Sequence, residues 1–169
     1  IANSWYDEYV TFLGTESGYY FVSQVDSLRG KKFVLSRDQY TTHCLNAENH
    51  KGCIEFVSLQ DLKGSIYFGG QYDKLQEVAT LEWDLLIIDE AHEGVDTLKT
   101  DVAFDHIKRK CTLHLSGTPF KALANGKFDD NAIFNWTYVD EQAAKRDWDA
   151  TSEEENPYAV MPQLNMYTY

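Results

Sequence analysis

Apolar residues in the middle of the chain form short continuous runs, and stretches of helical spacing separate these runs. The runs at 53–60 (CIEFVSLQ), 84–89 (DLLIID) and 111–117 (CTLHLSG) have the length of strands and end in polar residues. The stretches at 70–79 and 98–110 are predicted helices. An order of strand, helix, strand, helix, strand is typical of parallel strands joined by crossover helices. The pattern therefore predicts an α/β fold with a mainly parallel sheet flanked by helices.

The central strands of such a sheet are covered by helices on both faces, so they are apolar throughout rather than alternating. The run Leu85–Ile88 has this character. We therefore predict a central strand that is buried on both faces.

The remaining segments give weaker patterns. Trp5, Tyr9 and Phe12 recur at helical spacing and predict a short helix that begins after Ser4 as its N-cap. Two β-rich runs follow at 19–25 and 31–36, whereas the polar stretch 38–52 yields no prediction. A helix is predicted over 140–148, and residues 156–169 are predicted to be extended.

The chain is acidic, with 15 Lys and Arg against 27 Asp and Glu and a formal net charge of −12. This charge argues against broad nucleic-acid binding by the chain alone. The basic cluster at 108–110 follows a predicted helix, so we interpret it as the exposed helix end, where the helix dipole favours cations. The acidic segment 140–155 is expected to stay solvated.

Cysteine and histidine residues gather in one stretch. His43, Cys44, His50 and Cys53 offer two imidazoles and two thiolates, which zinc can bind. Their spacing differs from the usual arrangement of paired cysteines followed by paired histidines, so we expect a polar loop rather than a zinc site. The odd number of cysteines fits reduced thiols better than a disulfide framework.

Two polar motifs follow neighbouring predicted strands. Asp89 and Glu90 come directly after one strand, and Ser116-Gly117-Thr118-Pro119 ends the next. Ligands of open parallel sheets bind beyond the carboxyl ends of the strands. A strand-end aspartate can hold hydrated Mg²⁺ on nucleotide phosphates, and an adjacent carboxylate can polarise the attacking water. A solvated strand end is the simpler alternative, but the combination of both motifs favours a site.

The segment LLIIDEAHEG resembles motif II, the Walker B segment, of superfamily 2 helicases and translocases, and LHLSGTPF resembles their motif III. In this order and at this distance, the two motifs resemble the first RecA-like domain of the DEAD/DEAH group. The resemblance is especially to the res subunits of type III restriction enzymes, and it is firmest over 55–120. It implies a P-loop NTPase fold that uses ATP and Mg²⁺.

The resemblance also implies roles for single residues. Asp89 would bind Mg²⁺ through water, and Glu90 would orient or deprotonate the attacking water. His92 would couple the nucleotide state to a facing domain. The turn formed by Ser116, Gly117, Thr118 and Pro119 would link the nucleotide site to the nucleic-acid path. Ser58, in the segment VSLQDL, would stand at the position of motif Ib, whose hydroxyl contacts a strand phosphate.

An ATPase of this type also needs a phosphate-binding loop of the form G-x-x-x-x-G-K-[ST]. The only Gly-Lys pairs are Gly30-Lys31 and Gly126-Lys127, and neither has the upstream glycine or the following Ser or Thr. We therefore expect a partial RecA-like domain that lacks the P-loop strand and is inactive alone. The missing loop would lie upstream of Ile1, and the second RecA-like domain would lie beyond Tyr169.

The predicted organisation is a partial RecA-like domain over 1–155, followed by an extended segment over 156–169. The expected function is that of a fragment of an ATP-dependent DNA translocase or helicase from a restriction-type system, with RNA not excluded as the partner. Subunits of a restriction-modification system are further candidate partners. We expect a cytoplasmic location and no membrane association, because no signal peptide or membrane span is found. A noncatalytic RecA-like interaction domain and a metal-dependent nuclease built on Asp89 and Glu90 remain as alternatives.

Overall fold

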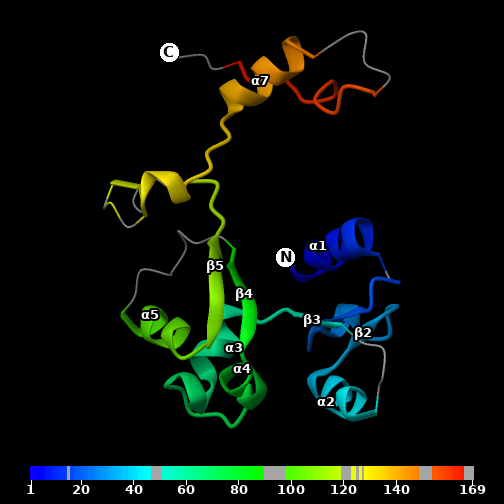
Figure 1. Ribbon diagram of the computed structural model, residues 1–169, viewed down its shortest axis with the longest axis vertical. Coiled ribbons are helices and arrows are strands. Elements are labelled where there is room, and N and C mark those ends of the chain that lie inside the picture. The colour runs from blue at the N-terminus through cyan, green and yellow to red at the C-terminus, as the bar shows by residue number, and fades with distance from the viewer. Residues whose placement is uncertain are drawn as a thin grey trace. The chain divides into compact units, whose positions relative to one another are not determined.

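Three parallel strands form the first sheet, in the order β2–β1–β3 (Figure 1). The computed structural model describes residues 1–14, 16–46, 51–89, 98–118, 123–124, 126, 128–148 and 154–165. The strands are β1 (Tyr19–Val22), β2 (Val34–Leu35) and β3 (Gly52–Glu55). Phe21 pairs with Val34 of β2 and with Ile54 of β3. The parallel pairing that the sequence pattern predicts is therefore confirmed in this sheet.

The helices around the first sheet begin with α1 (Ala2–Glu8), which continues as a π-helical turn over Tyr9–Leu13. A 3₁₀ turn (Asp26–Leu28) leads from β1 toward β2, and α2 (Arg37–Asn46) connects β2 to β3. The predicted N-cap at Ser4 is wrong, since α1 begins at Ala2 and Ser4 lies inside it.

The first core joins α1 to this sheet. Its buried residues are Ala2, Tyr6, Tyr9, Phe21 and Leu28. The Tyr6 ring meets the Phe21 ring edge-on at a centroid distance of 5.7 Å, and the Tyr9 hydroxyl donates a hydrogen bond of 2.8 Å to the Tyr19 carbonyl. Aromatic side chains thus fix α1 against the strands by both packing and hydrogen bonding.

Two parallel strands form the second sheet, β4 (Trp83–Ile88) and β5 (Arg109–His114). Before them come α3 (Leu59–Gly64), a 3₁₀ turn (Ile66–Phe68) and α4 (Gln76–Thr80), and α5 (Leu98–Asp105) lies between the strands in the sequence. The predicted order of strand, helix and parallel strand is confirmed here. The predicted strand 53–60 is shorter than expected, because β3 ends at Glu55 and Ser58 already caps α3.

The second core lies between the second sheet and its helices. Its buried residues are Leu62, Phe68, Leu75, Val78, Ala103 and Ile107. Leu86 of β4 packs against this cluster, and Ile88 is buried. The opposite side of the strands is different, since Leu85 is 46% and Ile87 is 39% exposed. The prediction that Leu85–Ile88 is buried on both faces is therefore wrong, because in the described part of the chain helices pack on one face only.

The helix predicted over 70–79 is confined to α4, which begins at Gln76. Leu75 has a left-handed backbone (φ +65°), which a continuous α-helix does not allow. The chain at Gly70 also approaches Gly64 closely, since a Cβ at Gly70 would lie 2.2 Å from the Gly64 carbonyl carbon. The stretch before α4 is thus a tight turn that requires glycine.

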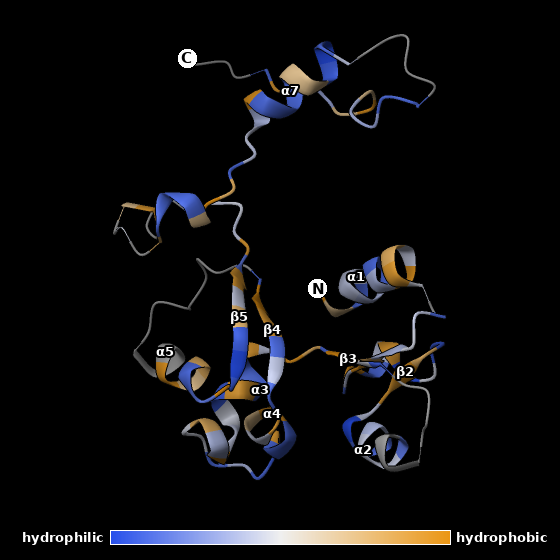
Figure 2. Ribbon diagram, viewed as in Figure 1, coloured by the Kyte–Doolittle hydropathy of each residue, from blue (hydrophilic) through white to orange (hydrophobic). Residues whose placement is uncertain are grey.

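The basic cluster 108–110 is not simply a helix end, because Arg109 and Lys110 begin β5, where Figure 2 shows hydrophilic residues. Lys110 forms an exposed ion pair of 2.7 Å with Asp84 of β4. The guanidinium of Arg109 donates to the carbonyls of Phe104 and Ile107, so one of the three cations does bind the end of α5.

The chain divides into two compact units, Ile1–Gly117 and Thr118–Tyr169. In the second unit a 3₁₀ turn spans Asp130–Ala132, and α7 spans Tyr138–Arg146 within the predicted helix region. Thr137 and Asp140 begin α7 with reciprocal capping hydrogen bonds. The predicted domain boundary at 155/156 stays a prediction. No helix in the described part of either unit is long and apolar enough to cross a membrane.

Candidate functional site

Asp89 directly follows the last residue of β4 and is exposed. Ile88 pairs with His114 of β5, and the Leu115 N–H donates a hydrogen bond of 2.9 Å to the Ile88 carbonyl. The pairing therefore continues one residue past β5, and Ser116 follows it. Because the strands are parallel, Asp89 and Ser116 leave the same end of the second sheet, as the sequence predicts.

The structure describes only part of the two motifs. Ser116 is half-buried, Gly117 is exposed, and Thr118 is the first residue of the second unit. Glu90, His92 and Pro119 lie outside the described residues. Ser58 is on a different element, at the start of α3.

The carboxylate of Asp89 accepts a hydrogen bond of 3.0 Å from the indole Nε1 of Trp5. The two residues are 84 positions apart in the sequence. Trp5 lies on α1, and its half-buried ring packs against the first core. No pattern in the sequence indicated this contact. The helical spacing of Trp5 and Tyr9 predicts only that both residues lie on the apolar face of a helix.

The donor chemistry at Asp89 fits a hydrated divalent cation. An exposed carboxylate at a strand end is a hard oxygen ligand of the kind that Mg²⁺ prefers. A carboxylate has about four acceptor positions, so it can accept from an indole N–H and still contact a metal-bound water. The exposed carboxylate is compatible with the Mg²⁺ role predicted for Asp89, which stays a prediction.

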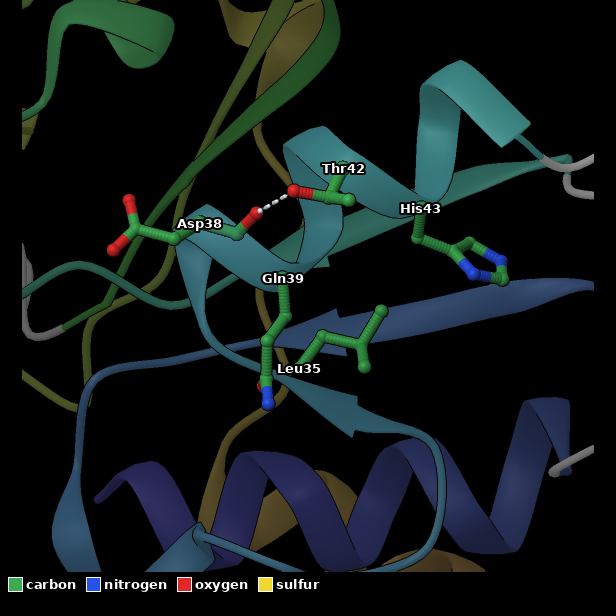
Figure 3. Close-up of a pocket in the computed structure, with 5 residues that line it drawn as sticks. All are labelled: Leu35, Asp38, Gln39, Thr42 and His43. Atoms are coloured by element: carbon green, nitrogen blue, oxygen red, sulfur yellow. Dashed lines mark hydrogen bonds between the residues drawn. The ribbon is translucent and has the colours of Figure 1, made fainter.

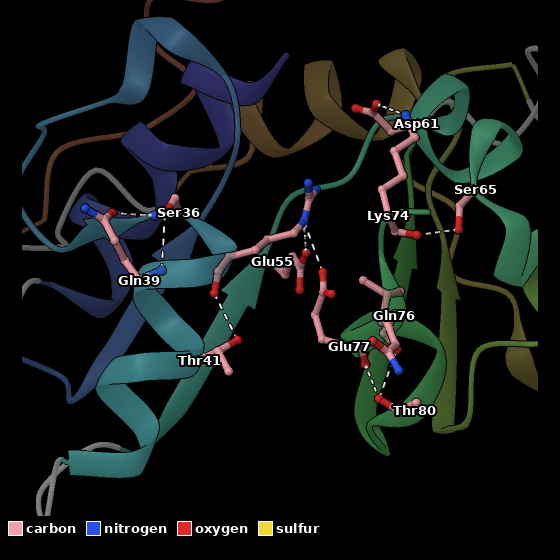
Figure 4. Close-up of polar contacts among 12 residues, drawn as sticks. Ser36, Gln39, Thr41, Glu55, Asp61, Ser65, Lys74, Gln76, Glu77 and Thr80 are labelled. Carbon is pink, nitrogen blue, oxygen red and sulfur yellow. Dashed lines mark hydrogen bonds and ion pairs between the residues drawn. The ribbon is translucent and has the colours of Figure 1, made fainter. Parts of the chain in front are cut away.

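A buried charge cluster lies where α2, β3 and α4 meet. The Arg37 Nε donates a hydrogen bond of 2.6 Å to Glu55 Oε1 and lies 3.3 Å from Glu77 Oε1. The exposed fractions of the side chains are 13% for Arg37, 4% for Glu55 and 29% for Glu77. Figure 4 shows the two glutamates reaching toward each other from β3 and α4. One guanidinium therefore serves two carboxylates.

Burial raises the pKa of Glu55 to about 7. The hydrogen bond and charge of Arg37 act against this rise in pKa, and the charge of Glu77 adds to it. Glu77 Oε1 accepts no hydrogen bond from the described residues, because the single Nε–H of Arg37 is directed at Glu55. No pattern in the sequence indicated this cluster, since its members are far apart in the chain.

Ser58 makes local contacts that stabilise α3. Its hydroxyl accepts from the Asp61 N–H at 3.0 Å and donates to Asp61 Oδ2 at 2.9 Å. Lys74 binds the other oxygen of Asp61 at 2.7 Å, and this hydrogen bond is the main reason that the pKa of Asp61 is lowered (Figure 4). The phosphate contact predicted for Ser58 stays a prediction, and the observed role of its hydroxyl is an N-cap.

The residues of the possible zinc set lie on separate elements. His43 is on α2, where its ring contacts Tyr20 at a centroid distance of 4.5 Å, and Cys53 is on β3. The side chain of Cys44 and the whole of His50 lie outside the described part. Within that part, no group of three or more His, Cys, Asp or Glu side chains is placed to hold a metal ion.

A shallow hollow of 520 Å³ lies beside α2 (Figure 3). Its lining residues are Leu35, Asp38, Gln39, Thr42 and His43. None of these residues belongs to motifs Ib, II or III, and His43 comes from the possible zinc set. The Thr42 hydroxyl donates a hydrogen bond of 3.0 Å to the Asp38 carbonyl within the same helix, and the hollow follows the surface of α2.

The chain matches the model of a known protein family. The family model for the type III restriction enzyme res subunit matches residues 1–121, which include both sheets, Asp89 and the motif at 116–119. No curated protein and no solved structure matches the chain. The matched family consists of the first motor domains of superfamily 2 helicases. The short parallel sheets flanked by helices are consistent with part of a RecA-like domain. The chain therefore belongs to the type III restriction enzyme res subunit family.

Proposed function

We propose that the chain is part of an ATP-dependent motor that moves along DNA in a restriction-type system. This proposal rests on the positions of Asp89 and Ser116, which follow two paired parallel strands at the same end of the second sheet. The chain's family supports it, since its members are motor domains. Nucleotide phosphates bind at this end of open parallel sheets.

In the proposed mechanism, each motif has one task. Asp89 would hold a hydrated Mg²⁺ through one of its water molecules, and the bound ion would supply positive charge against the nucleotide phosphates. Glu90 orients the attacking water and accepts its proton. His92 and the turn at 116–119 pass the nucleotide state to a second RecA-like domain and to the DNA path.

The nucleic-acid side of the proposal rests on Ser58, which would contact a strand phosphate. Its hydroxyl already accepts from the Asp61 N–H and donates to the Asp61 carboxylate. A hydroxyl oxygen has two lone pairs but only one proton, so a phosphate would have to replace Asp61 as the acceptor. DNA contact through Ser58 would thus require rearrangement of this cap. DNA is the proposed track, and RNA is the alternative.

We propose further that the 169-residue chain does not turn over ATP alone. Its sequence contains no G-x-x-x-x-G-K-[ST] loop, so no lysine and loop amides are present to hold the β- and γ-phosphates. The same observation favours the second candidate, a noncatalytic RecA-like interaction domain. The two candidates differ in what the natural full-length protein does.

The deciding experiment measures ATP hydrolysis by the natural full-length protein with and without duplex DNA. We expect DNA-stimulated, Mg²⁺-dependent turnover that Glu90→Gln lowers by at least about 100-fold, the usual minimum for loss of a general base. Glu82→Gln removes an exposed carboxylate just before β4 and serves as the matched control, with turnover unchanged.

Absence of turnover in the full-length protein would favour the noncatalytic domain. Equal rates in the Glu90→Gln variant and the wild type would refute the role of Glu90. A parallel assay on the 169-residue chain should detect no turnover, and robust hydrolysis there would refute its proposed inactivity.

A further inference from the structure

The contact between Trp5 and Asp89 links two elements that the sequence sets far apart. The indole Nε1–H of α1 donates to Oδ2 of Asp89 at 3.0 Å. Asp89 follows β4 of the second sheet, whereas Trp5 packs against the core of the first sheet. The carboxylate expected to face Mg²⁺ is thus bonded to a side chain that belongs to the other sheet.

The donor is held firmly. The neighbouring Tyr6 is buried, and its hydroxyl donates a hydrogen bond of 3.1 Å to the Lys32 carbonyl. Tyr9, one turn further along, is 3% exposed and bonded to the Tyr19 carbonyl. Because both anchors lie within one turn of Trp5 and its ring packs against the first core, the indole N–H has little freedom to move away from Asp89. A fixed donor constrains the acceptor that it binds.

The chemistry of an indole suits this position. Its N–H only donates and carries no charge, so it orients a carboxylate without neutralising it. A lysine or arginine in the same place would compete with the cation for the charge of Asp89. A group that hydrogen-bonds to a metal-binding side chain orients that side chain toward the metal. Loss of such a group commonly lowers metal affinity by about 10- to 100-fold.

We propose that Trp5 is a positioning residue for Asp89, which it holds in the orientation that contacts the hydrated metal ion. This inference rests on the proposed function, since it takes Asp89 as the Mg²⁺ residue. It adds a residue outside motifs II and III to the site, and it makes the packing of α1 a condition for metal binding.

The test titrates Mn²⁺, as a paramagnetic substitute for Mg²⁺, into the natural full-length protein saturated with a nonhydrolysable ATP analogue and measures free Mn²⁺ by electron paramagnetic resonance. We expect one site that is lost in Asp89→Asn and that binds about tenfold more weakly in Trp5→Phe. Thr11→Val is the matched control, because it removes an exposed hydrogen bond to the Asp7 carbonyl from the same helical segment without touching Asp89 or the anchors of α1, and its Mn²⁺ affinity should equal that of the wild type.

A second variant separates the hydrogen bond from the packing of the ring. Replacement of Trp5 by 3-benzothienylalanine keeps the shape of the ring and exchanges the N–H for sulfur. It should weaken Mn²⁺ binding as Trp5→Phe does. In the NMR spectrum of the wild type, the indole N–H signal of Trp5 should broaden on Mn²⁺ addition, and it should shift in Asp89→Asn.

The outcomes distinguish the two proposals. If the benzothienyl variant binds Mn²⁺ as tightly as the wild type while Asp89→Asn does not, Trp5 does not position Asp89 and the metal role of Asp89 stands. If the wild type shows no Mn²⁺ site that Asp89→Asn removes, the metal role of Asp89 fails, and the role of Trp5 fails with it.

Discussion

Phe21 and Val22 in the first sheet are 0% and 1% exposed, whereas Leu85 and Leu113 in the second sheet are 46% and 44% exposed. Both sheets consist of parallel strands with apolar runs. In the first sheet, α1 covers the middle of β1 with aromatic side chains. In the second, the described helices pack against Leu86 and leave the alternate residues of β4 exposed.

The apolar content of a strand thus indicates how much surface it can bury, but it does not indicate which elements cover that surface. A strand that is apolar on both faces gains the full free energy of burial only if both faces are covered. The first sheet should therefore be the more stable part of the unit 1–117. The second sheet should depend more on its single core and on contacts such as the Arg37 cluster that connect it to the first.

The largest expected effect comes from the first core. Phe21→Ala removes a fully buried ring that contacts Tyr6 and Tyr9, so it should lower the free energy of unfolding by about 3–5 kcal/mol. Urea denaturation followed by circular dichroism measures the change. A loss below about 1 kcal/mol would contradict the view that the first sheet is the better packed one.

The next largest effect should come from the charge cluster between α2, β3 and α4. Arg37→Met leaves Glu55 and Glu77 without their shared cation, and loss of one partner of a buried pair commonly costs about 3–5 kcal/mol. The loss should be greater at pH 8, above the raised pKa of Glu55, than at pH 6. Unfolding at pH 6 and pH 8 measures it, and an equal loss at both values would exclude a role for Glu55 ionisation.

Glu55 itself should make stability depend on pH. Its pKa is raised from 4.5 to about 7 in the folded state, so the folded protein binds more protons than the unfolded chain within that window. Stability should therefore fall as the pH rises from 4.5 to 7, by about 2–3 kcal/mol at most. Glu55→Gln should remove this part of the pH dependence. A wild-type curve parallel to that of the variant would refute the shifted pKa.

The cap of α3 should have a smaller effect. Ser58→Ala removes the side-chain acceptor for the Asp61 N–H and should cost about 1 kcal/mol. Ser58→Asn keeps a capping acceptor and is the matched control, with a smaller loss expected in thermal unfolding. If both variants lose the same stability, capping is not what Ser58 contributes.

The smallest effect is expected on the exposed face of the second sheet. Leu85→Ala should cost only about 0.5 kcal/mol, because almost half of its side chain is already exposed. The same measurement on Leu86→Ala, which faces the second core, should give a larger loss. Equal losses would mean that the two faces of β4 do not differ in coverage.

The sequence predicted the parts of the fold that depend on local pattern. The parallel neighbours β4 and β5 and the α5 crossover follow from apolar runs and helical spacing. The helix α2 was missed because it is polar, although Ser36 and Gln39 form reciprocal capping hydrogen bonds, and a Ser followed three residues later by Gln is a known start signal. The false helix start at Gly70 could have been avoided, since the pair Gly69-Gly70 indicates a turn.

The candidate site was only partly predictable for a different reason. Asp89 and Ser116 each follow a strand, so the strand pattern alone places them at the same end of the sheet. Trp5 and Arg37 act on residues that are distant in the sequence, and a single sequence contains no record of such contacts. Their roles became visible only through the distances to Asp89, Glu55 and Glu77.

The half-covered β4–β5 pair has a practical consequence for handling the chain. Leu85, Ile87 and Leu113 are exposed, and among the described strands β4 pairs only with β5, which leaves backbone N–H and C=O groups on its outer edge. Such an edge can template intermolecular β-pairing. The net charge of −12 opposes that association by repulsion. Because salt screens this repulsion, light scattering from concentrated solutions should rise with ionic strength, and low-salt buffers should keep the chain monodisperse.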